Sequence, residues 1–234
     1  MKTKILLLFI AFFIILSCQE RKETKNKLPE LKKEHKAQTK NTIPEQDTIT
    51  IEYLNKHNSY DYETKLRNGY DLEFKYFREN KNSSIEMCLN LKKGNTLIDT
   101  LNIMGYGAPH KNLGYVGADY NNYFAFVNSF GSGNPHEFRL IEKSTGKTIK
   151  SGFIVDSFKK PEFLLYTKGY DSLMLYDMEK KKDNYIEDLA KSKEIDLMVS
   201  ELSDGLKIKK VTAKYVVIEI ENHENKIITK KYNR

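Results

Sequence analysis

The sequence is short of cysteine and of long apolar stretches, and it contains no tryptophan. Its only cysteines are Cys18 and Cys88, so one chain can form at most a single disulfide. The longest uninterrupted apolar run covers residues 5–16, whereas a helix that spans a bilayer needs about 20 residues. A permanent transmembrane anchor is therefore not predicted.

Several motifs of common enzyme classes are also missing. Gly146-Lys147-Thr148 has no glycine five residues before it, which a phosphate-binding loop of the Walker type requires. The sequence has no Gly-x-Ser-x-Gly elbow and no His-Glu-x-x-His pair. Acidic residues are too numerous to single out one acid–base couple. No cofactor is predicted, and a binding protein is favoured over an enzyme.

The N-terminus carries a secretory signal. A basic start, Met1-Lys-Thr-Lys4, precedes the apolar run, and Ser17-Cys18 follows it. The segment Ile15-Leu16-Ser17-Cys18 resembles the lipobox of bacterial lipoproteins. The resemblance implies that residues 1–17 are removed as a signal peptide and that Cys18 receives fatty acyl chains such as palmitate. Two or more chains hold a protein stably on a membrane, each buried methylene adding about 0.8 kcal/mol.

The same resemblance implies a cellular location. The protein is expected in the cell envelope, with the lipid on Cys18 holding it to the membrane. In a bacterium with two membranes, Gln19 after the cysteine favours the outer membrane, on either of its faces.

The formal charge of +7 invites a nucleic-acid interpretation, but the distribution of charge argues against it. Lys2 and Lys4 leave with the signal, and residues 19–40 hold eight Lys or Arg against four Glu. Residues 41–234 are left with 29 basic and 28 acidic residues and are almost neutral. Segment 18–46 is charged and poor in apolar residues, so we expect it to be a disordered, lipidated tether.

Residues 47–234 are predicted to form one mainly β domain. Apolar residues alternate at period two in Ile85–Leu91 and in several later segments, which is typical of strands. An alternating set also covers Ile49, Ile51 and Tyr53. Turns are expected near residues 94, 146, 181 and 223. Cys88 lies on the strand face opposite to Met87 and Leu89, and it is predicted to be unpaired and unreactive.

These hairpins indicate an antiparallel meander. Their spacing resembles the rhythm of propeller blades, so a small propeller-like arrangement is one alternative and a β-sandwich is the other. One short helix is predicted near residues 193–203, because Ile195, Val199 and Leu202 follow helical spacing. Ser192 is its expected N-cap and Gly205 its expected end.

Six of the twelve glycines fall between residues 105 and 133, in three segments that cover 104–110, 113–119 and 130–136. Most glycines of this kind serve turns, but they also allow close approach of a ligand. The candidate ligand or partner surface comprises Tyr106, His110, Asp119, Tyr120 and His136. Tyrosines here can stack on sugar or peptide. His110, Asp119 and His136 are also possible ligands for zinc or iron, although their spacing matches no metal motif and no metal is predicted.

Three functions remain open. The favoured one is a non-enzymatic envelope lipoprotein that binds a protein, a peptide or a glycan through the 104–136 loops. The second is a metal-dependent hydrolase that uses the two histidines and Asp119. The third is a protective lipoprotein, such as an immunity factor against a toxin.

Overall fold

We analysed a computed structural model of the chain, which describes residues 50–57, 65–108 and 110–234. These residues belong to one compact unit, Thr48–Arg234. The predicted signal peptide, the predicted lipidation site Cys18 and the predicted tether lie outside the described residues. In the described part of the chain, no helix is long and apolar enough to cross a bilayer.

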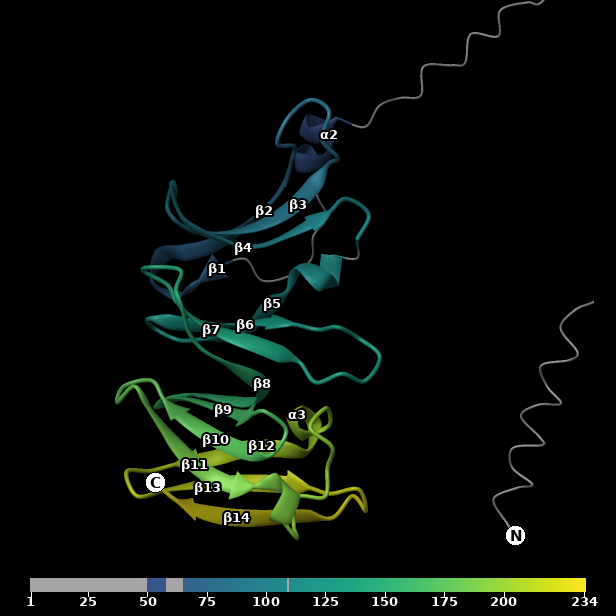
Figure 1. Cartoon of the computed structure of the whole chain (residues 1–234). Helices are drawn as coiled ribbons and strands as arrows, with labels where there is room; N and C mark the ends of the chain where they lie inside the picture. Colours follow the sequence, from purple (N-terminus) through teal and green to yellow (C-terminus); the bar gives the residue numbers. More distant parts are fainter. Residues whose placement is uncertain (1–49, 58–64, 109) are drawn as a thin grey trace, which may run out of the picture. The chain divides into compact units, whose positions relative to one another are not determined.

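The unit is mainly β, as predicted, and its strands form three antiparallel sheets (Figure 1). The first sheet contains β1 (Lys65–Leu66), β2 (Tyr70–Phe77), β3 (Glu86–Lys93) and β4 (Thr96–Gly105). The second is a seven-stranded meander of β5 (Tyr115–Asp119), β6 (Tyr123–Asn128), β7 (Glu137–Glu142), β8 (Thr148–Lys159), β9 (Glu162–Lys168), β10 (Ser172–Asp177) and β11 (Lys182–Asp188). The third contains β12 (Leu206–Val211), β13 (Tyr215–Glu221) and β14 (Ile227–Asn233).

Short helices connect or flank the sheets. They are α2 (Ile51–Lys56), η2 (Arg67–Gly69), η3 (His110–Leu113), η4 (Leu189–Lys191) and α3 (Leu202–Gly205). All four expected turns are present between paired strands, with Gly94, Gly146, Lys181 and Asn225 at positive φ. Positive φ is what tight reversals of a hairpin require, which explains the turn residues seen in the sequence.

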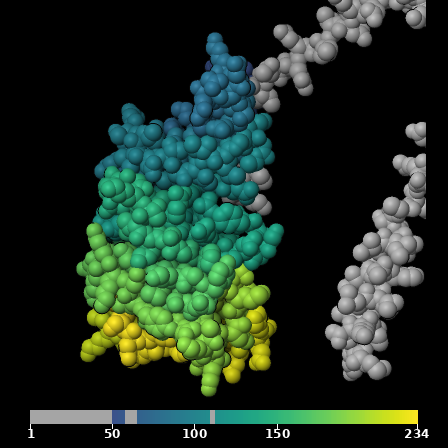
Figure 2. All heavy atoms as spheres, viewed as in Figure 1, coloured from purple at the N-terminus to yellow at the C-terminus, as the bar shows by residue number. Residues whose placement is uncertain are grey.

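The sheets pack as successive layers in chain order (Figures 1 and 2). On β6, Phe124 and Phe126 pack against Leu89 and Leu91 of the first sheet. Their neighbours on β6 point to the other side, because side chains alternate along a strand, and they join a cluster that contains Phe138 and Tyr166 from the two halves of the second sheet. Burial on both faces explains the continuous apolar run at 123–127.

A third cluster joins the far half of the second sheet to the third sheet. Phe163 and Leu165 of β9 pack there with Val216, Ile218 and Ile220 of β13. The strand that links the two halves is β8, which has twelve residues and a register shift between Ile154 and Asp156. Such a shift bends a strand, so β8 contributes both to the layer of β5–β7 and to the layer of β9–β11.

The propeller alternative is not adopted. The hairpins that turn near residues 146 and 181 belong to one continuous seven-stranded sheet, because β8 pairs with both β7 and β9. The structure is therefore a layered meander, closer to the sandwich alternative.

Two local predictions need correction. The alternation of Ile51 and Tyr53 belongs to a helix, α2, because Thr50 acts as its N-cap and accepts a hydrogen bond from the Tyr53 amide. The helix expected near 193–203 is present only as the turn α3 at its end. Ser192 does bind the amide of Ile195, as an N-cap would, but the chain does not continue as a helix from there.

Candidate functional site

Of the five residues predicted to form a ligand or partner surface, Asp119 and His136 lie near opposite ends of β5 (Tyr115–Asp119). Asp119 ends β5, and Tyr120 follows it. His136 lies against Tyr115, the first residue of β5. Four residues separate the two ends of this strand, which corresponds to about 13 Å at the usual rise. Tyr106 follows the last residue of β4. His110 is the first residue of η3, and its side chain is outside the described part of the structure.

His136 holds a glycine loop in place. Its Nδ1 is 2.7 Å from the Tyr115 hydroxyl, and its Nε2 is 3.2 Å from the Ser129 hydroxyl. Its carbonyl accepts a hydrogen bond from the amide of Ile154 on β8. Both ring nitrogens are therefore engaged by neighbours within the fold, and the ring secures the 130–136 loop to β5.

Asp119 is the acceptor in a buried ion pair. Its Oδ1 is 2.7 Å from the Nζ of Lys143, and the Lys143 side chain is only 1% exposed. Its Oδ2 accepts a hydrogen bond from the backbone amide of Arg67 at 2.9 Å. Lys143 also donates to the carbonyls of Tyr120 and Arg67, at 2.6 and 3.2 Å. Burial lowers the pKa of Lys143, and the adjacent Asp119 carboxylate acts in the opposite direction.

Tyr120 cannot contribute to a surface, because it is fully buried. Its hydroxyl donates to the carbonyl of Phe163 at 2.8 Å, and burial raises its pKa far above the ordinary value. Tyr106, in contrast, is 47% exposed and makes an edge contact with the ring of Tyr76. Only one of the two tyrosines is thus available to a partner.

The described residues do not bring Asp119 and His136 together as metal ligands. Asp119 binds Lys143 and the amide of Arg67, and His136 contacts Tyr115 at the other end of β5. Residues 50–57, 65–108 and 110–234 contain no group of three His, Cys, Asp or Glu side chains that could hold a metal ion. Asp119 and His136 are therefore not placed to share one metal ion.

Two glycines of the 113–119 segment serve packing. A Cβ on Gly114, where φ is +106°, would lie 2.3 Å from the ring of Phe126. A Cβ on Gly117 would lie 2.6 Å from Val127. Both distances are far below van der Waals contact, so these glycines are required for β5 to approach β6 closely.

An apolar groove of about 480 Å³ lies at the end of the second sheet where His136 is found. Three segments line it: the end of the 130–136 loop, the turn between β9 and β10, and the stretch from η4 to residue 200 (Pro135, Tyr170, Asp171, Leu189, Ala190, Leu197, Met198, Val199, Ser200). Tyr170 is 64% exposed and Met198 is 63% exposed. Phe130, on the same glycine loop as Pro135, is 66% exposed.

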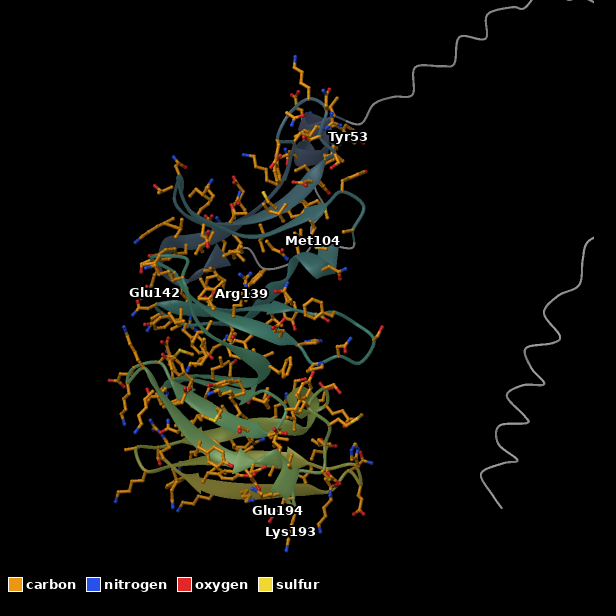
Figure 3. The ribbon with its side chains drawn as sticks, viewed as in Figure 1. Tyr53, Met104, Arg139, Glu142, Lys193 and Glu194 are labelled. Atoms are coloured by element: carbon orange, nitrogen blue, oxygen red, sulfur yellow. The ribbon has the colours of Figure 1, made fainter. Side chains whose placement is uncertain are left out.

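A polar pocket of about 650 Å³ lies at the opposite end, where β5 finishes beside Lys143. Its wall includes Glu142, labelled in Figure 3. The wall comes from η2, from the end of β3 and from the three turns that follow β5, β7 and β10 (Asn68, Tyr70, Lys93, Asn121, Asn122, Tyr123, Glu142, Lys143, Ser144, Met178, Glu179, Lys181). The predicted residues Asp119 and Tyr120 support this pocket from beneath and do not line it.

Sequence reasoning missed most residues of both recesses. Asn121, Ser144 and Glu179 read as ordinary turn residues, and nothing local distinguishes them from other turns. Met198 lies within the helix predicted near 193–203, where apolar residues at helical spacing usually pack in a core. The sequence held no signal for Lys143 either, because a lysine in a turn is normally exposed and its burial is seen only in the structure.

Comparisons of the chain with protein-family models, with curated proteins and with solved structures found no match. The functional argument therefore depends on the residues and on their geometry.

Proposed function

We propose that this chain is a lipid-anchored protein of the bacterial cell envelope that binds another envelope protein through its apolar groove. The membrane attachment is supported by the lipobox-like segment that ends at Cys18. In a bacterium with two membranes, Gln19 favours the outer one. The observation that carries the binding function is the set of exposed apolar side chains around a groove of about 480 Å³.

Exposed apolar side chains that gather in one place mark interaction sites, whereas single ones are normal on any protein. Tyr170 and Met198 belong to the residue types that are enriched in protein interfaces. The neighbouring 130–136 loop adds Phe130 and Pro135 to the same end of the sheet. His136 holds this loop through both ring nitrogens, so the surface is organised before a partner arrives.

A protein partner fits this groove better than a glycan. Its lining is apolar along most of its length, and Asp171 is the one charged residue that lines it. Sugars require many hydrogen-bonding groups, whereas a peptide segment can insert Leu, Met or aromatic side chains into such a recess.

The test is co-purification from cross-linked membranes with the full-length, lipidated protein as bait. Met198→Glu and Tyr170→Ser are expected to remove a specific partner, because each places a polar group or a gap at the groove. Loss of a central contact costs roughly 2 kcal/mol or more, which weakens binding by at least about tenfold.

Matched controls are Ile227→Glu and Tyr185→Ser, since Ile227 and Tyr185 are 60% and 56% exposed and do not line the groove. These variants should retain the partner. A partner that persists with both groove variants, or that is lost equally with the controls, would contradict the proposal.

The anchor has an independent test. Cys18→Ala should leave the domain folded and should move the protein from the detergent phase to the aqueous phase on phase separation. Retention of the variant in the detergent phase would disprove attachment through Cys18.

A further inference from the structure

The polar pocket at the other end of the second sheet is a separate recess with different chemistry. Its volume of about 650 Å³ lies within the range of small-molecule sites, which runs from about 300 to 1,000 Å³. Five segments of the first two sheets and their turns meet there, from Asn68 to Lys181. An arrangement assembled from five segments depends on how the layers pack.

The pocket has a rigid base. Tyr70 and Tyr123 are buried, and Lys143 beneath them is held by Asp119 and by two carbonyls. The ammonium of Lys93 lies 4.9 Å from the centre of the Tyr70 ring. A base built from buried, hydrogen-bonded groups keeps its shape, which lowers the entropic cost of binding.

One wall of the pocket is tied to the end of the third sheet. Asp177 accepts hydrogen bonds from the amides of Glu179 and Lys180, which shapes the turn that lines the pocket. Its other oxygen is 2.6 Å from the guanidinium of Arg234, and both side chains are buried. This wall is therefore also fixed before a ligand binds.

The lining offers many hydrogen-bonding groups and a balanced charge. The side-chain amides of Asn121 and Asn122 have no hydrogen-bond partner among the described residues, and both asparagines are exposed. Lys143 is neutralised by Asp119. The other charged residues of the lining are two lysines and two glutamates (Lys93, Lys181, Glu142, Glu179).

We propose that this pocket binds a neutral saccharide unit. A side-chain amide presents a donor and an acceptor side by side, and this pair matches the adjacent hydroxyl groups of a sugar ring. Asn121 and Asn122 supply two such pairs, and Ser144 adds a hydroxyl. Equal numbers of positive and negative side chains give no net attraction to an anion, and the polar wall disfavours an apolar ligand. This site is distinct from the groove, and its function does not depend on a protein partner.

The experiment is saturation-transfer NMR on the full-length protein, purified in a detergent without a sugar headgroup. The probes are neutral hexoses and N-acetylated amino sugars, as monomers and short oligomers, with a uronic acid and inorganic phosphate as separate arms. We expect saturable binding of at least one neutral saccharide, and binding that is insensitive to salt.

The variant Asn121→Ala/Asn122→Ala should weaken that binding by about thirtyfold or more, because it removes the hydrogen bonds of two side-chain amides. Asn82→Ala is the matched control, since Asn82 is exposed and lies outside the pocket. Ser144→Phe provides a second variant that should fill the recess and abolish binding. Folding of each variant is checked by circular dichroism.

Three outcomes would overturn the proposal. The first is that no neutral saccharide binds. The second is that only the uronic acid or phosphate binds, with an affinity that falls as salt rises. The third is that the asparagine variant and Ser144→Phe both bind as the wild type does. Loss of the protein partner from the groove has no bearing on these results.

Discussion

Removing the carboxylate from the buried Asp119–Lys143 pair should destabilise the fold strongly. In Asp119→Asn, the ammonium of Lys143 stays buried beside an uncharged amide. Breaking a buried pair on one side costs about 3–5 kcal/mol. The lower end applies here, because Lys143 keeps the carbonyls of Tyr120 and Arg67. With a denaturant slope of about 2 kcal/mol/M, a loss of about 3 kcal/mol lowers the urea midpoint by about 1.5 M.

The pH dependence gives a second signature. Burial lowers the pKa of Lys143 in the folded protein below the ordinary value of 10.5. At a pH between the pKa of Lys143 in the folded protein and its pKa in the unfolded chain, the unfolded chain binds a proton that the folded protein lacks. The free energy of unfolding therefore rises with pH over this range. In Asp119→Asn the pKa of Lys143 in the folded protein falls further, because the carboxylate no longer raises it. The pH range over which the free energy of unfolding rises then extends to lower pH. The difference between wild type and variant should therefore be smaller at about pH 9.5 than at neutral pH.

The assay is urea unfolding followed by circular dichroism. The exposed pair Lys65–Asp71 serves as the control, because Asp71→Asn should cost less than about 1 kcal/mol. In the double variant Asp119→Asn/Lys143→Met no buried charge remains, so much of the lost stability should return. A cost below about 1 kcal/mol for Asp119→Asn, or a double variant less stable than the single one, would refute the reasoning.

Two further predictions follow from buried positions. Gly114→Ala should destabilise the protein by several kcal/mol, because the added Cβ would overlap the Phe126 ring. In the control Gly94→Ala, the added Cβ meets no atom within 4 Å, so the variant should cost only about 1 kcal/mol through its positive φ. Urea unfolding measures both losses of stability. Cys88 is buried, and burial raises the pKa of its thiol. The thiol should therefore react slowly with a thiol reagent in the native protein and rapidly in urea. Rapid labelling of the native protein would contradict this prediction.

The elements of the fold could be read from local patterns. Period-two alternation placed β3 correctly, and the turn residues placed all four hairpins, because both signals act over a few neighbouring residues. The same reasoning failed at α2, where one N-cap hydrogen bond outweighs three alternating residues. It also failed before α3, where apolar residues at helical spacing lie in a loop.

The candidate sites depended on contacts between distant residues. The sequence singled out Asp119 and His136 from their setting among glycines, but their partners are Lys143 and Tyr115, at opposite ends of β5. Tyr120 is followed by two asparagines, which is typical of an exposed turn. It is nevertheless buried, and its hydroxyl donates a hydrogen bond to the Phe163 carbonyl of β9. No local pattern encodes such partners.

The sequence by itself determined the lipobox-like segment, the near neutrality of residues 41–234 and the strand-and-turn rhythm of the β unit. Only the tertiary structure decided that β8 joins two layers into one sheet and that an apolar groove and a polar pocket lie at its two ends. The physical reason is range. Alternation, capping and turn chemistry act between near neighbours, whereas a recess is formed by whichever segments the packing of successive layers brings together.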